Sequence, residues 1–204
     1  SNESLNVPVE VANYNGVSLS DIAPSWKIKN ALGKILFEGL FDKQDIPVGN
    51  CINIGSINQS LQTLSDPARL IVEVSVAGFN NSWDIFVYPA SVPPVRDNII
   101  VTQVFHANFI KELQKGSKVL LTLKKGSVKQ EMGGDVEVGF SSIFWNTAWT
   151  NGQAPHTLGI LCDPSHPALS FFPTQYHSNW QWWDAMTNSN AIRLDSISSN
   201  IKPI

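Results

Sequence analysis

The segment Arg69-Leu70-Ile71-Val72-Glu73-Val74-Ser75-Val76 has the clearest strand pattern in this 204-residue chain. Its apolar positions alternate with polar ones and are mostly β-branched, which suits a pleated surface with one buried face. Toward the N-terminus, residues 7–14 alternate in the same way and stop at Asn15-Gly16, a turn signal. The two segments predict strands of antiparallel sheets rather than helices.

Four further segments of the first 90 residues have strand character, namely 25–29, 34–39, 50–57 and 83–88. Gly33 separates the first two, which predicts a hairpin, and Gly78 to Ser82 is predicted to form a loop. In residues 50–57, alternation places Cys51, Asn53 and Gly55 on one face and Ile52 and Ile54 on the other. This series of short strands predicts an all-β immunoglobulin-like sandwich over residues 1–90.

A proline-rich segment, Pro89-Ala90-Ser91-Val92-Pro93-Pro94, ends the series of strands. Proline has no backbone N–H to donate to a sheet ladder, so these residues cannot continue the sandwich. We therefore place a domain boundary here, with one domain over residues 1–90 and a second over residues 91–204.

The second domain has a different pattern of apolar residues. Residues 98–102 and 118–123 are nearly continuous apolar runs, as in parallel strands that are covered on both faces. Between them, residues 106–114 have helical spacing, and Gly116 follows where a helix C-cap glycine is expected. The pattern predicts a β-α-β unit of an open parallel α/β sheet, with further strands at 157–162 and 191–195. Residues 126–155 show no regular periodicity.

Composition excludes several partners. The formal net charge of −3 and the absence of a basic run disfavour nucleic acid. No apolar run approaches the length of a membrane span. The two cysteines, Cys51 and Cys162, lie far apart in sequence and are interpreted as two buried free thiols rather than a disulfide framework.

Aromatic residues gather in the second domain, where five of the seven tryptophans lie between Trp145 and Trp183. Such a cluster can be a platform that stacks on sugar rings, a packing core for the irregular segment, or an anchor at a protein interface. Trp182 and Trp183 are adjacent and face differently on any element, so at least one ring is expected to be structural. The candidate ligand-binding residues are Trp145, Asn146, Trp149, His177, Asn179, Trp180, Trp182 and Trp183.

The sequence evidence for catalysis or metal binding is weaker than the evidence for an aromatic binding face. A retaining glycosidase needs two carboxyl groups at a fixed short separation, and the acids of the second domain form no convincing pair: Glu131, Asp135, Glu137, Asp163, Asp184 and Asp195. Cys162 has no glycine-rich elbow that would suit a nucleophile activated by His166 or His177. The histidines at 156, 166 and 177 lack the close spacing of zinc ligands. We therefore predict no catalytic residue, no metal and no cofactor.

The sequence resembles a known family in several segments. The late strand Asn81 to Pro89 is similar to the last β-sandwich of bacterial glycoside hydrolase family 2 enzymes, the β-galactosidase-like group. The motifs that follow also resemble those proteins: residues 144–146 (FWN), 159–169 (GILCDPSHPAL), 172–174 (FPT) and 177–183 (HSNWQWW). In that family the region lies C-terminal to the catalytic barrel, and its second half resembles a flavodoxin-like, amidotransferase-like domain without amidotransferase chemistry.

This resemblance implies a non-catalytic ancillary region of a glycoside hydrolase that supports or assembles the catalytic domain in carbohydrate degradation. The alternative is a carbohydrate-binding module that uses the Trp145–Trp183 aromatic residues. The implied partners are the catalytic domain of the parent enzyme, carbohydrate and a further copy of the chain, and the implied location is the periplasm, cell surface or extracellular space. Similar proteins continue beyond Lys202-Pro203-Ile204 into another strand, so we expect a truncated α/β domain.

Overall fold

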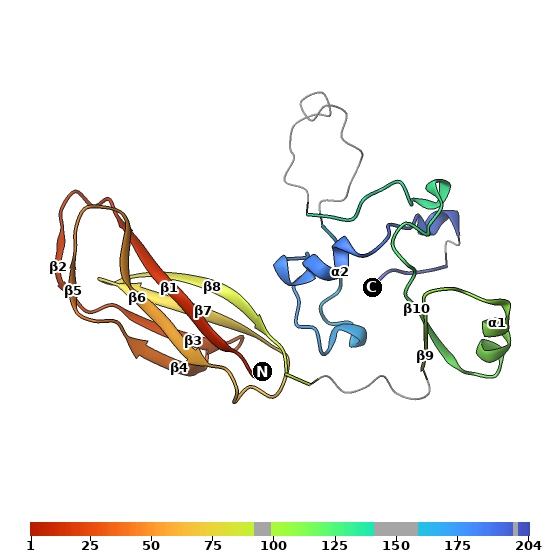
Figure 1. Cartoon of the computed structure of the whole chain (residues 1–204), viewed down its shortest axis with the longest axis horizontal. Helices are drawn as coiled ribbons and strands as arrows, with labels where there is room; N and C mark the ends of the chain where they lie inside the picture. Colours follow the sequence, from red (N-terminus) through yellow and green to blue (C-terminus); the bar gives the residue numbers. More distant parts are fainter. Residues whose placement is uncertain (92–98, 141–158, 198–199) are drawn as a thin grey trace, which may run out of the picture. The chain divides into compact units, whose positions relative to one another are not determined.

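The computed structural model describes residues 1–91, 99–140, 159–197 and 200–204 (Figure 1). The chain divides into two compact units. Unit 1 comprises Ser1–Val92 together with Ala168–Pro173, and unit 2 comprises Pro93–Pro167 together with Thr174–Ile204. Among the described residues, no helix has the length and apolar character to cross a membrane.

Unit 1 is built from antiparallel strands. A four-stranded sheet has the order β4-β3-β7-β8, and two-stranded sheets pair β1 with β6 and β2 with β5. The strands are β1 (Ser4–Asn13), β2 (Leu19–Ile22), β3 (Ser25–Asn30), β4 (Ile35–Leu40), β5 (Gln44–Ile46), β6 (Gly49–Ser60), β7 (Ala68–Val76) and β8 (Phe79–Val87). Each strand segment predicted in residues 1–90 is present, whereas β2 and β5 were not predicted because they are too short for alternation to show.

One hydrophobic core joins these sheets. Alternate residues of β3 and β7 point into it, so that Ile28 and Leu70 are fully buried. From the β1–β6 pair, Val9, Ile54 and Ile57 enter the same cluster. Since side chains from separate sheets share one core, the sheets pack face to face, an arrangement compatible with the predicted β-sandwich.

The β7–β8 connection differs from the prediction. Val76 pairs with Phe79, so the turn consists of Ala77 and Gly78, and residues 79–82 belong to β8 rather than to a loop. Both turn residues have positive φ, 49° for Ala77 and 86° for Gly78, as a type I′ turn requires. The polar run Asn80-Asn81-Ser82 suggested a loop, but strand pairing with β7 overrides its composition.

Cys51 was predicted to be a buried free thiol, and this prediction is wrong, because the free cysteine is exposed. Alternation along β6 places it with Asn53 on the outer face, opposite Ile52 and Ile54. A register shift follows along β6: Val9 pairs with Gly55 and the next residue, Glu10, pairs with Asn53, so that Ile54 is an extra residue opposite β1. This bulge allows Ile54 and Ile57, three residues apart, both to face the core.

Unit 2 contains the predicted β-α-β unit. Strands β9 (Ile99–Thr102) and β10 (Lys118–Leu121) are parallel, and helix α1 (Ala107–Gln114) connects them. Gly116, with φ +88°, ends the helix, where its N–H donates to Leu113 and the N–H of Ser117 donates to Glu112. These two bonds form a Schellman motif, which is why a glycine stands there.

The remainder of unit 2 is less regular than predicted. Residues 191–195 form no strand, and a 3₁₀ helix η4 (Leu194–Ser196) begins within them. Of the predicted strand at 157–162, Thr157 and Leu158 lie outside the described residues, and Leu161 forms an isolated bridge with His177. The other elements are η1 (Gln130–Met132), η2 (Pro167–Leu169, grouped partly with unit 1), η3 (Trp180–Trp182) and α2 (Trp183–Thr187). In the described residues, the parallel sheet therefore consists of β9 and β10 alone, and no further strand pairs with either of them.

Candidate functional site

Three aromatic rings of unit 2 meet at its surface, and we call Phe140, Trp180 and Trp183 the aromatic cluster. The ring centroids of Phe140 and Trp183 are 6.0 Å apart with nearly parallel planes, at an angle of 5°. Trp180 lies 5.8 Å from Phe140 and 5.7 Å from Trp183, with its ring tilted. Despite these contacts, Trp180 is 77% exposed and Trp183 is 52% exposed. Two of the three rings of the cluster therefore lie at the surface.

Local helical geometry explains why these two tryptophans share a face. Trp180 opens η3 and Trp183 opens α2, which follows without a break, so the two residues are three positions apart on a helical backbone. Asn179 precedes them as the N-cap, and its side-chain oxygen accepts a hydrogen bond from the N–H of Gln181 at 3.3 Å. The cap fixes where the helical turn begins and therefore which way Trp180 points.

Trp182 faces away from the cluster. Its indole N–H donates to the hydroxyl of Thr174 at 2.8 Å, and its side chain is half-buried. It also lines an apolar cavity of about 300 Å³ together with Ile160 and the buried Met186. A ring whose polar atom is already bonded inside unit 2 acts as support, so Trp182 holds the turn that presents Trp180 and Trp183.

A short backbone pairing stabilises the segment before the cluster. Ser178 donates its N–H to Ile160 at 3.0 Å, and its hydroxyl accepts the N–H of Ile160 at 3.0 Å. Gly159 beside it has φ +111°, and a Cβ at this position would stand 2.6 Å from the Ser178 hydroxyl. The close approach requires glycine. This pairing leaves His177 and Tyr176 exposed on the approach to Trp180.

Family models match both parts of the chain. The model described as "Domain of unknown function (DUF8487)" matches residues 100–204, just over half of the chain. The chain belongs to the DUF8487 family. A second model, "Domain of unknown function (DUF8488)", matches residues 3–89. A search of curated proteins found no match. The aromatic cluster lies wholly within the DUF8487 region.

Cys162, in the DUF8487 region, has a structural environment. It is buried, its thiol donates to the carbonyl of Gln175 at 3.3 Å, and its N–H donates to the carbonyl of Tyr176 at 2.9 Å. A buried thiol that donates its hydrogen to a backbone carbonyl makes a structural contact within the unit. The geometry therefore favours a packing role for Cys162.

Asp163, in the same region, is a carboxylate with a lowered pKa. The side-chain hydroxyl of Ser165, and then its backbone N–H, donate to Asp163 and hold the pKa of that carboxyl below its usual range. An acid poised to donate a proton near neutral pH needs the opposite shift. Asp163 instead organises the turn that leads to Pro167.

The structure brings together only part of the predicted site. Trp180 and Trp183 share the cluster, Asn179 caps its turn, Trp182 supports it, and His177 lies exposed before it. The other three candidates, Trp145, Asn146 and Trp149, lie outside the described residues. Phe140 was not predicted, and nothing in its sequence surroundings marks it as a partner of Trp183. Within the described residues, no three His, Cys, Asp or Glu side chains gather as metal ligands would.

Proposed function

We propose that the chain is a non-catalytic ancillary region of a glycoside hydrolase, and that the aromatic cluster is its carbohydrate-binding face. The carbohydrate context comes from the resemblance of segments such as 177–183 to β-galactosidase-like enzymes. The observation that carries the binding role is the exposure of Trp180 and Trp183 in rings already packed on each other and on Phe140.

Physical chemistry favours a sugar as the occupant of this face. An exposed indole can cover the apolar C–H face of a pyranose ring while the sugar hydroxyls turn to polar groups. The neighbouring polar side chains are the exposed His177 and Asp184, the latter in the first turn of α2. A rigid aromatic surface loses little conformational entropy on binding, since its rings are already ordered by mutual contact.

The fold assignments belong to the same proposal. The four-stranded sheet and common core of unit 1 support an immunoglobulin-like sandwich. For unit 2, the parallel pair β9–β10 with helix α1 between them supports a flavodoxin-like, amidotransferase-like ancestry. Periplasmic, cell-surface or extracellular location follows from the proposed role in glycan degradation.

A titration of the full chain tests the carbohydrate-binding role. Galactosides and plant-glycan oligosaccharides should quench tryptophan fluorescence and shift its maximum. Trp180→Ala and Trp183→Ala should each weaken the affinity about two- to tenfold, as expected for one aromatic stacking contact. Trp83→Ala is the matched control, because Trp83 is 50% exposed but lies on β8 of unit 1. Unchanged fluorescence at millimolar sugar would contradict the role.

Docking onto the catalytic domain is the second candidate function of the same face. Large exposed tryptophans are also typical anchors of protein interfaces, and Trp180 and Trp183 have the exposure for it. In this case the chain should bind the remainder of its parent enzyme and raise that enzyme's thermal stability, with both effects reduced by Trp180→Ala. If the sugar titration is negative and the chain neither binds nor stabilises the parent enzyme, the ancillary function itself fails.

A further inference from the structure

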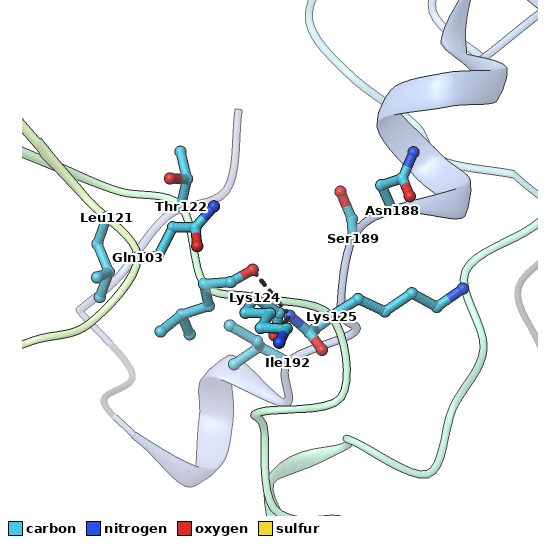
Figure 2. Close-up of a pocket in the computed structure, with 10 residues that line it drawn as sticks. Gln103, Leu121, Thr122, Lys124, Lys125, Asn188, Ser189 and Ile192 are labelled. Atoms are coloured by element: carbon cyan, nitrogen blue, oxygen red, sulfur yellow. Dashed lines mark hydrogen bonds between the residues drawn. The ribbon is translucent and has the colours of Figure 1, made fainter.

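A second cavity of unit 2 opens at the carboxyl ends of its parallel strands. It has a volume of about 640 Å³ and is shown in Figure 2. Gln103 is the first residue after β9, Thr122 is the first after β10, and both line the cavity. Open α/β sheets bind their ligands at this edge, because loops from adjacent strands converge there. The volume is within the usual range of small-molecule sites.

The two walls of this cavity are joined by one amide side chain. Asn190 accepts the N–H of Gly126 at 2.7 Å and donates to the carbonyl of Lys124 at 3.1 Å. The loop after β10 is thereby tied to the segment after α2, which contributes Asn188 and Ser189 to the opposite wall. The cavity therefore has a preset shape and is not merely a gap between two loops.

The lining is divided between polar and apolar side chains, and its charged residues are all positive. It includes Lys124 and Lys125 but no aspartate or glutamate. The ammonium group of Lys125 donates to the carbonyl of Thr187 at 2.5 Å, which positions it and leaves two N–H donors for another group. Among the lining residues, Asn188 bonds to a carboxylate, since its amide donates to Asp184 at 3.0 Å. Gln103 and Ser189 add neutral hydrogen-bonding groups.

We propose that this cavity binds a small hydroxylated anion, namely a monosaccharide that carries a carboxylate or a phosphate. The anionic group is placed against the ammonium group of Lys124, where charge-assisted hydrogen bonds are strong, and Lys125, bonded to the carbonyl of Thr187, adds positive charge to the surroundings. The sugar hydroxyls bond to Gln103, Asn188 and Ser189. No ring of the aromatic cluster lines this cavity, so the inference does not depend on the proposed stacking site.

Isothermal titration calorimetry on the full chain tests the inference, with D-galacturonate, D-galactose 6-phosphate and D-galactose as probes. At least one anionic sugar should bind, and galactose should bind at least about tenfold more weakly, which is the loss of one charge-assisted contact. The comparison of carboxylate with phosphate identifies which anion the site prefers. Lys124→Gln should weaken binding of the preferred anionic sugar about tenfold, and Lys125→Gln should weaken it less, because that ammonium group is bonded to Thr187.

Two control variants distinguish binding in this cavity from general electrostatic attraction and from binding at the aromatic cluster. Lys111→Gln removes the same charge from an exposed position on α1 and should leave the affinity unchanged. Trp180→Ala alters the aromatic cluster alone and should also leave the affinity unchanged. The inference is overturned if no anionic sugar binds at millimolar concentration, if galactose binds equally well, or if Lys111→Gln weakens binding as much as Lys124→Gln.

Discussion

Replacement of Asn190 tests how unit 2 keeps its shape. The side chain of Asn190 makes three hydrogen bonds to the backbone of the loop after β10: it accepts from Gly126 at 2.7 Å and donates to Lys124 at 3.1 Å and Leu123 at 3.3 Å. A hydrogen bond contributes about 0.5–1.5 kcal/mol net. Because the loop is largely exposed and water can replace these partners, we expect Asn190→Ala to destabilise unit 2 by about 1–2 kcal/mol.

An isosteric variant sharpens this prediction. Asn190→Asp keeps the acceptor for Gly126 but turns a carboxylate oxygen toward the carbonyls of Leu123 and Lys124, so at neutral pH it should cost more than Asn190→Ala. Repulsion raises the carboxyl pKa in the folded state above its unfolded value of about 3.9. The folded state then binds the proton more tightly, and stability falls as pH rises through the folded pKa. Below about pH 4 the protonated acid donates again, and the deficit relative to Asn190→Ala should disappear.

Two measurements check the reasoning. Urea denaturation monitored by tryptophan fluorescence gives the stability of each unit, provided that two transitions are fitted. Hydrogen exchange at the Gly126 amide gives the local effect, which should be faster exchange in Asn190→Ala than in the wild type. Unchanged exchange at Gly126 in Asn190→Ala, or equal pH profiles for the two variants, would refute the assignment of these bonds.

Three further predictions concern unit 1. Leu70→Ala should destabilise it by about 2–5 kcal/mol, because Leu70 is fully buried, whereas Leu32→Ala, at a residue 93% exposed, should change the denaturation midpoint little. Burial raises the pKa of Tyr88 to about 12. The folded state therefore favours the neutral phenol, and this contribution to stability is fully present below about pH 10 and is lost as the pH rises toward 12. Tyr88→Phe should therefore flatten the alkaline fall in stability, and a parallel fall in both proteins would count against this. Gly39→Ala should cost about 1–3 kcal/mol in thermal or urea unfolding, since a Cβ there would stand 2.7 Å from the Trp26 ring, and a wild-type midpoint would contradict that packing.

The strands of unit 1 were predictable because local pattern and tertiary environment agree. In β3 and β7, alternate residues are buried, so the period of two in the sequence is the period of the core. Prediction was wrong where pairing overrides composition, as in residues 79–82 of β8. The burial of Cys51 was mispredicted on residue type, although its alternation with Asn53 indicated the outer face.

In unit 2 the sequence predicted the β-α-β unit but not the elements that follow it. The apolar residues at 191–195 have strand propensity, yet the segment is held by single backbone bonds, such as the donation from Arg193 to Met132 at 2.8 Å, and forms no ladder. For the site, the residue types around Trp180 and Trp183 were recognisable. Their partner Phe140 was not, because a contact between residues 40 positions apart leaves no local periodicity.

The different sources of stability in the two units explain why both proposed sites lie in unit 2. Unit 1 buries one continuous apolar cluster that joins its sheets. Within the described part of unit 2, the buried hydrophobic side chains are Cys162 and Met186. Hydrogen bonds such as those of Asn190 hold the loops of this unit. Such hydrogen bonds determine the positions of the loops without removing much apolar surface from water. Large rings such as Trp180 therefore remain at the surface. Under the proposed function, a bound sugar or protein would supply the burial that the unit itself lacks, and it would stabilise the folded unit by an amount that rises with the logarithm of ligand concentration over Kd.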